Sequence, residues 1–275
     1  MGYQFNIRLL LVSCSFFLFS SGGNCQELFR APAAFQAMGH TGASLESPLA
    51  LFSNPAGTAG SKLAGGILYS NRFLLEDLST SSAFLVLPVQ KNRFLFTFSQ
   101  FGSEGFREDK FSAGMSRRLS PAVSAALQFH YFSLFLAEND QRPGQLISDL
   151  GIQLRFGELG FGMQYFNPYG VSASNNSLPV DYPWVIRLGA RKNFQDSFLL
   201  TAELYQEQHA SIEPRFGMQY LINNQLSLRC GLEVQTGNLA MGLGYLINTI
   251  QTDIAFSYHQ YLGLSPSVTI YYHRK

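Results

Sequence analysis

Between residues 198 and 275, apolar and polar side chains alternate along one segment after another, each about ten residues long, with short turns between them. In the first segment the apolar parity holds Phe198, Leu200, Ala202 and Leu204, and the polar parity holds Thr201, Glu203, Tyr205 and Glu207. Successive side chains of a strand point to opposite faces, and about 9 to 11 residues of strand cross a bilayer. The pattern therefore predicts transmembrane β-strands with one face toward lipid and the other toward a polar lumen.

The same alternation, followed upstream to residue 63, predicts fourteen strands. They are 63–75, 79–90, 93–101, 107–119, 121–136, 146–157, 158–167, 183–193, 196–207, 210–221, 224–235, 238–247, 249–259 and 266–274. The second is the least regular, because it is apolar on both parities and contains Pro88. The expected fold class is all-β, an antiparallel fourteen-stranded transmembrane barrel over residues 63–275.

Turn lengths indicate the orientation of this barrel. Connections after even-numbered strands are tight, as at 91–92 and 194–195, whereas those after odd-numbered strands include 137–145 and 168–182. Outer-membrane barrels have short periplasmic turns and longer outer loops. We therefore expect both chain termini in the periplasm of a Gram-negative bacterium.

The N-terminus is typical of a secretory signal. Arg8 supplies positive charge, residues 9–19 are apolar, and residues 20–23 are small. We expect a signal peptide over residues 1–25 and a mature chain that starts near Gln26. Lipidation of Cys25 is the alternative, although Asn24 before it fits such a site poorly. Removal of residues 1–25 leaves Cys230 as a single cysteine, which is expected to be a lipid-facing apolar side chain.

Residues 26–62 differ from the rest, since they are rich in Ala, Gly, Ser and Pro and show no alternation. An eight-stranded barrel is filled by its own side chains, and fourteen strands enclose more space. We therefore expect residues 26–62 to form a plug inside the lumen. Gly160, Gly162, Gly242 and Gly244 lie on the inward parity and are expected to make room for it.

Composition agrees with a membrane location. Charged residues make up 13% of the chain, which also contains 25 Phe and 13 Tyr; soluble domains usually carry about 25% charged residues. No segment after the signal approaches the roughly 18 apolar residues of a membrane helix. The formal net charge of +1 excludes a strongly basic nucleic-acid surface. The apolar outer strand faces make outer-membrane lipid the expected surrounding partner.

Charged side chains of both signs lie on the inward parity from the sixth strand onward. They are Asp149, Arg155, Arg187, Arg191, Glu203, Glu207, Glu213, Arg215, Arg229, Glu233 and Asp253. Because unpaired charge in a confined lumen is costly, we interpret them as a cross-strand ionic network that braces the wall against the plug. A selectivity lining is the alternative, although such linings normally use rings of one sign.

Candidate catalytic groups are sparse. Asp253, Ser257 and His259 share one face of a strand, but residues two apart are separated by about 6.6 Å, which is beyond hydrogen-bond reach. The histidines show no metal-ligand spacing, and no phosphate-binding loop is present. We therefore expect no enzyme activity, no metal and no cofactor.

Residues 35–44 (FQAMGHTGAS) and 51–57 (LFSNPAG) carry a family resemblance. The positions that match are Gly39, Gly42, Asn54, Pro55, Ala56 and Gly57. Together they resemble the N-terminal signature of the FadL-like outer-membrane barrels, which include long-chain fatty-acid transporters and the PorV and PorQ components of the type IX secretion system. His40 stands in place of a second glycine, and Thr58 follows Gly57. The ending at 259–266 is also similar to PorV and PorQ, and the PorP/SprF-like secretion barrels are a second, weaker resemblance.

The resemblance implies a fourteen-stranded barrel whose N-terminal hatch lies in the lumen, with Asn54, Pro55 and Ala56 at its folded turn. It implies a non-enzymatic accessory or scaffold of protein secretion and surface attachment, with a secretion-system protein as partner. The alternative is a transporter of long-chain fatty acids or another hydrophobic ligand. That alternative needs an apolar pocket in the lumen, to which Phe132, Leu134 and Phe166 are candidate contributors. A soluble all-β protein is excluded because the outer strand faces lack polar residues.

Overall fold

The computed structural model describes residues 31–137, 144–169 and 182–274. The expected signal peptide, with Cys14 and Cys25, and much of the connection at 168–182 lie outside the described residues. The strands are β1 (Ala64–Asn71), β2 (Ser79–Val89), β3 (Asn92–Gly102), β4 (Phe106–Arg118), β5 (Val123–Leu136), β6 (Gly144–Phe156), β7 (Leu159–Phe166), β8 (Val185–Phe194), β9 (Phe198–Glu207), β10 (Glu213–Leu221), β11 (Leu226–Glu233), β12 (Asn238–Ile247), β13 (Ile250–His259) and β14 (Gly263–His273).

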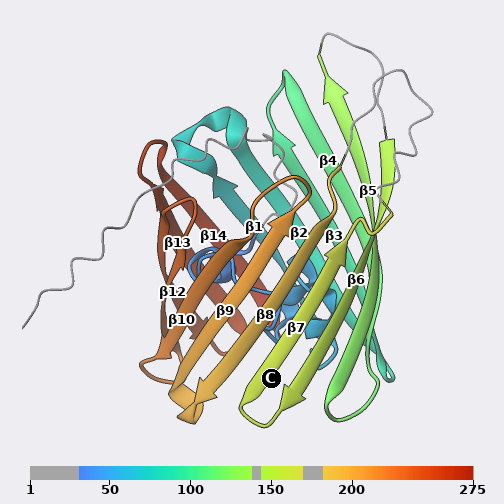
Figure 1. Ribbon diagram of the computed structural model, residues 1–275, viewed down its shortest axis with the longest axis vertical. Helices are drawn as coiled ribbons and strands as arrows, with labels where there is room; N and C mark the ends of the chain where they lie inside the picture. The colour runs from blue at the N-terminus through green and yellow to red at the C-terminus, as the bar shows by residue number, and fades with distance from the viewer. Residues whose placement is uncertain (1–30, 138–143, 170–181, 275) are drawn as a thin grey trace, which may run out of the picture.

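These fourteen strands form one closed antiparallel barrel, as the alternation predicts. Each strand pairs with its neighbours in the chain, and β1 pairs with β14 to close the wall, with Ala64 opposite His273 and Ser70 opposite Ser267. The tight connections and the C-terminal strand end gather at one end of the barrel, whereas the longer connections extend from the other (Figure 1). These are called below the short-turn end and the long-connection end.

The predicted parity is confirmed along β9. Leu200 and Leu204 are 40% and 47% exposed, whereas Thr201 and Glu203 are buried. Exposed aliphatic and aromatic side chains continue around the outer wall, as expected for a surface in contact with lipid. None of the described helices is long and apolar enough to cross a membrane.

Strand boundaries differ from the prediction mainly beside β1. The predicted strand 63–75 ends at Asn71, because Phe73 and Leu74 adopt φ values of 56° and 57° within the short helix η3 (Arg72–Leu74). Another short helix, η4 (Glu76–Leu78), precedes β2, and η5 (Gln195–Ser197) joins β8 to β9. Pro88 does not break β2, since it lies next to the last residue of that strand.

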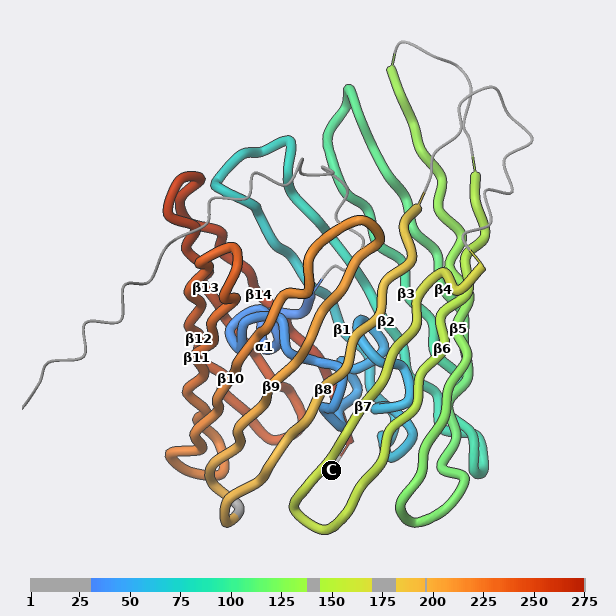
Figure 2. The backbone as a smooth tube through the Cα atoms, viewed as in Figure 1, coloured from blue at the N-terminus to red at the C-terminus, as the bar shows by residue number. Residues whose placement is uncertain are grey.

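Residues 31–62, here called the luminal segment, lie inside the barrel (Figure 2). The segment contains α1 (Ala33–Gln36), η1 (Pro48–Phe52) and η2 (Pro55–Thr58). Its apolar side chains, among them Phe35, Leu49 and Phe52, form one core cluster with luminal side chains of β1, β2 and β3. The segment therefore packs against the inner wall.

Close approach of the luminal segment to the wall depends on glycine at several strand positions. A Cβ atom at Gly231 would overlap the backbone of Met38 and Gly39, and one at Gly162 would overlap Ala43. The expectation that Gly160 and Gly244 also make room for the plug is wrong. An added Cβ at those two positions would instead meet luminal side chains of the wall itself, Arg191 and Asp253.

Candidate functional site

Glu203 on β9 holds the luminal segment through its backbone. Its Oε2 accepts hydrogen bonds from the amides of Gly42 and Ala43, both at 2.8 Å, and its Oε1 accepts one from Arg187 Nε at 2.6 Å. Arg187 Nη2 also donates to the carbonyl of His40 at 2.6 Å. The side chains of Glu203 and Arg187 are 1% and 4% exposed. This group of charge-assisted hydrogen bonds, called below the Glu203 clamp, joins β8 and β9 to the segment.

A second contact joins the luminal segment to β11. His40 Nδ1 lies 2.7 Å from Glu233 Oε1, and Arg215 Nη2 lies 3.9 Å from the other oxygen of Glu233. Arg215 also donates to Glu213 at 2.7 Å. His40 stands where the resembled motif has glycine, and its side chain supplies this contact.

Four more of the predicted charges form ion pairs in two separate places, whereas Glu207 accepts a hydrogen bond from Tyr205. Arg229 lies 2.7 Å from Asp253, with both side chains almost completely buried. Near the short-turn end, Arg155 and Arg191 both contact Glu46 of the luminal segment, at 3.4 Å and 2.5 Å. These pairs link wall to wall and wall to segment.

Asp149 differs from this pattern, because it forms no ion pair with an arginine among the described residues. Its Oδ2 accepts a hydrogen bond from Gln164 at 2.7 Å and lies 3.5 Å from His130 Nε2. His130 Nδ1 lies 2.8 Å from Ser112 Oγ. The predicted arginine–carboxylate network therefore does not extend to Asp149, which lies in a separate polar cluster on β4 to β7.

The Asn54 motif forms a closed turn in contact with the wall. Asn54 Nδ2 donates to the carbonyls of Ala43 and Ile152 at 2.7 Å and 2.9 Å, and its Oδ1 accepts from the amide of Ala56 at 3.1 Å. Pro55 begins η2. A Cβ atom on Gly57 would overlap the carbonyl of Leu45. The Asn54 side chain thus forms hydrogen bonds with backbone groups of the luminal segment and also connects the turn to β6.

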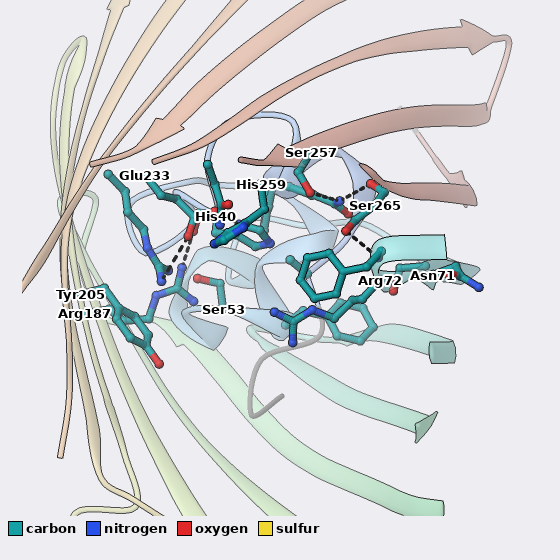
Figure 3. Close-up of a pocket in the computed structure, with 18 residues that line it drawn as sticks. His40, Ser53, Asn71, Arg72, Arg187, Tyr205, Glu233, Ser257, His259 and Ser265 are labelled. Carbon is teal, nitrogen blue, oxygen red and sulfur yellow. Dashed lines mark hydrogen bonds and ion pairs between the residues drawn. The ribbon is translucent and has the colours of Figure 1, made fainter. Parts of the chain in front are cut away.

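A cavity of about 190 Å³ lies between the luminal segment and the wall (Figure 3). Its aromatic lining comes from Phe35, Phe52, Phe73 and Tyr205. Its polar lining includes Gln36, His40, Ser53, Ser70, Asn71, Arg72, Arg187, Arg215, Glu233, Asn238, Ser257, His259 and Ser265. Figure 3 shows Arg187, Tyr205 and Glu233 on one side of this space and Asn71 and Arg72 on the other.

Asp253, Ser257 and His259 are not joined in the lumen. Asp253 pairs with Arg229, and Ser257 accepts a hydrogen bond from Gln36 at 2.9 Å. His259 accepts from the backbone of the following turn. These side chains have structural partners and form no catalytic relay.

The apolar luminal residues named from the sequence lead to a packed cluster. Phe132 and Phe166 are fully buried and pack with Ile147, Val185 and Tyr182. The rings of Phe132 and Tyr182 have centroids 4.3 Å apart, and the Tyr182 hydroxyl donates to Glu108 at 3.1 Å. Phe132 and Phe166, which were candidate contributors to an apolar pocket, are therefore part of a packed cluster.

No protein-family model matches the chain, and no curated protein matches it. Solved structures do. They include the toluene transporter TbuX of Ralstonia pickettii (TM-score 0.67, 13% identity, 90% of this chain and 100% of that chain) and a FadL homologue of Pseudomonas aeruginosa (TM-score 0.62, 12% identity, 88% and 98%). CymD, a monoaromatic hydrocarbon channel, matches with a TM-score of 0.69 and 11% identity over 89% and 97%.

The chain has the fold of the FadL-type outer-membrane barrels. At these identities the likeness concerns the fold, and the resemblance to PorV and PorQ rests on the sequence motifs alone. The matched proteins are named as transporters, a channel and a FadL homologue, and none of those names denotes an enzyme.

Several residues of the candidate site were not singled out from the sequence. Arg72 and Phe73 reach the cavity because the chain leaves the strand pattern after Asn71. Glu46 lies outside the strand pattern, yet it pairs with two arginines of the wall. The inward parity could have identified Tyr205, but nothing in the sequence shows which inward residues border empty space.

Proposed function

We propose that the protein is a non-enzymatic outer-membrane channel for a small, partly hydrophobic ligand, with the luminal segment as its plug. In this proposal residues 1–25 are a cleaved signal peptide, both termini face the periplasm, and ligand enters from the long-connection end. The observation that carries the proposal is the aromatic and polar cavity between plug and wall, in a fold shared with hydrocarbon transporters and channels.

The cavity indicates the ligand class. An engineered apolar cavity of about 150 Å³ holds benzene, so a space of about 190 Å³ suits a single-ring molecule. The ligand would contact the aromatic rings of Phe35, Phe52, Phe73 and Tyr205. It would also need a polar group to form hydrogen bonds with His40 and its polar neighbours. The favoured ligand is therefore a ring-sized molecule with one polar substituent, such as a phenol.

Binding at this site is linked to the plug. Gln36 donates to Ser257 Oγ and to the carbonyl of Ser265, both at 2.9 Å, and His40 bridges to Glu233. All of these residues line the cavity. A ligand that bonds to Gln36 or His40 competes with contacts that hold the plug, and so favours plug displacement.

Binding of p-cresol to the purified barrel, measured by isothermal titration calorimetry, tests the proposal. Ser70 lines the cavity from β1, and its neighbour Tyr69 is 46% exposed on the outer face. Ser70→Trp fills the cavity and should weaken p-cresol binding at least about tenfold, whereas Tyr69→Trp should leave it unchanged. No binding by the wild-type barrel, or equal effects of the two substitutions, would contradict the proposal.

An accessory role in protein secretion is the second candidate. The luminal segment packs against the inner wall beside a buried ion pair, and the motifs at 35–44 and 51–57 resemble those of PorV and PorQ. Such a protein would act through a protein partner and need no ligand. Purification of the intact barrel in mild detergent tests this role: it is supported if a secretion component co-purifies and p-cresol does not bind.

A further inference from the structure

Basic side chains surround the lumen at the short-turn end. They are Lys62, Arg93, Arg118, Arg155, Arg191 and Arg274, here called the basic mouth. They lie in or directly beside one end of β1, β3, β4, β6, β8 and β14, so they extend around much of the opening. Glu46 of the luminal segment pairs with two of them, Arg155 and Arg191.

Positive charge at this mouth exceeds the negative charge available to offset it. Arg118 and Arg274 are exposed and form no ion pair with any residue that the structure describes. The guanidinium of Arg118 lies against Gly60, where an added Cβ would come within 2.7 Å of its Nη2. Arg118 therefore leans over the luminal segment and presents its charge to the opening.

A cavity of about 300 Å³ lies among these residues. It is bordered by Glu46, Ser47, Pro48, Gly57, Gly60, Ser61, Lys62, Arg118, His273 and Arg274. The long-connection end has the opposite character, with exposed Glu76, Asp77 and Glu104. Charge complementarity thus favours an acidic partner at the short-turn end and disfavours one at the other end.

We propose that the basic mouth is a docking site for an acidic peptide segment of a periplasmic protein. The cations are spread over six strands, which suits several carboxylates along one chain better than a single small anion. Four of the cations lie on the luminal parity of the adjoining strand: Lys62, Arg118, Arg155 and Arg191. They therefore face the aqueous opening and not the surrounding lipid headgroups. The inference rests on the proposed orientation of the barrel, and it does not depend on ligand transport.

The test measures binding of a fluorescein-labelled oligoglutamate peptide to the full-length barrel in non-ionic detergent by fluorescence anisotropy. The wild type should bind, and added NaCl should weaken binding, because exposed charges are screened over about 8 Å at physiological ionic strength. The double substitution Arg118→Glu/Arg274→Glu should lower the affinity about tenfold or more, since it turns two attractions into repulsions.

The matched control is Arg117→Glu/Lys192→Glu. It makes the same change in net charge at the same end, but neither side chain borders the cavity of about 300 Å³, as Arg118 and Arg274 do. It should change the affinity by less than about twofold. Folding of each variant is checked by its heat-dependent migration in gels, and an oligoglutamine peptide should not bind.

Three results would overturn the proposal: no binding by the wild type, equal loss in both double variants, or displacement of the peptide by phosphatidylglycerol, which would make the mouth a lipid headgroup site. Ser70→Trp should bind the peptide normally. A failure of p-cresol binding and a failure of peptide docking are therefore distinguishable.

Discussion

Substitution of Glu203 by Gln is expected to loosen the luminal segment while the barrel wall stays folded. In the wild type this buried carboxylate accepts two backbone amides of the segment and neutralises Arg187. The glutamine side chain would keep an acceptor oxygen but would leave the guanidinium without its counter-charge. Breaking a buried ion pair on one side costs about 3 to 5 kcal/mol.

Hydrogen–deuterium exchange of peptides that cover residues 33–58 measures this effect. A loss of about 4 kcal/mol from the free energy of local opening accelerates exchange about a thousandfold, given about 1.4 kcal/mol per factor of ten. Exchange in β2 to β6, far from the Glu203 clamp, should change little. Glu158→Gln, at the exposed turn between β6 and β7, is the control and should have no effect.

A double variant separates the lost ion pair from a general loss of packing. Arg187→Met removes the cation that Glu203→Gln leaves unpaired, so the combination should exchange more slowly than Glu203→Gln alone. Unchanged exchange in Glu203→Gln would show that the clamp does not hold the segment. Equal acceleration in segment and wall would show that the pair stabilises the barrel as a whole.

Three further substitutions test the packing of the lumen. Gly231→Val should displace the luminal segment, because the added Cβ would overlap the backbone of that segment. Hydrogen–deuterium exchange over residues 33–58 should therefore be faster. Gly105→Ala is the control, because an added Cβ there meets nothing. Phe132→Ala should destabilise the barrel by about 3 to 5 kcal/mol in guanidinium unfolding, unlike lipid-facing Phe129→Ala, which leaves no buried cavity. Asn54→Ala removes three hydrogen bonds, to the carbonyls of Ala43 and Ile152 and from the amide of Ala56, and should lower the free energy of segment opening by about 3 kcal/mol, measured by exchange. Exchange similar to that of the wild type would contradict this value.

The wall was predictable from sequence because its determinants are local. Lipid contact repeats at every second residue of a strand. The outward position of Leu200 and the inward position of Glu203 can therefore be predicted from their own strand alone. The tight turn predicted at 194–195 likewise lies within one to two residues of the short helix η5 (Gln195–Ser197). Strand number and parity therefore follow from the chain read in order.

The contents of the lumen were less predictable, because they depend on contacts between distant residues. Glu203 and Arg187 were both placed inward, but the bonds from Glu203 to Gly42 and Ala43 join residues 160 positions apart or more. Asp149 shares their parity, yet the register places it beside Gln164 and His130. The charge of an inward side chain indicates only that it needs a partner. The strand register determines which residue that partner is.

The cavity depended on a backbone feature that alternation cannot show. The left-handed conformations of Phe73 and Leu74 end β1 early and turn Arg72 and Phe73 toward the lumen. Neither residue is a glycine, so the sequence carries no obvious mark of this turn. The cavity on which the proposed function depends was therefore the part of the molecule least predictable from the sequence.

Uptake of radiolabelled p-cresol by proteoliposomes tests whether ligand passes through the cavity beside Ser70. Proteoliposomes that contain the wild-type barrel are compared with those that contain Ser70→Trp or Tyr69→Trp, and empty liposomes give the background permeability. Uptake should be faster with the wild type and with Tyr69→Trp than with empty liposomes, and it should return to background with Ser70→Trp. Uptake at the background rate in the wild type, or an unchanged rate in Ser70→Trp, would contradict a channel that works through this cavity.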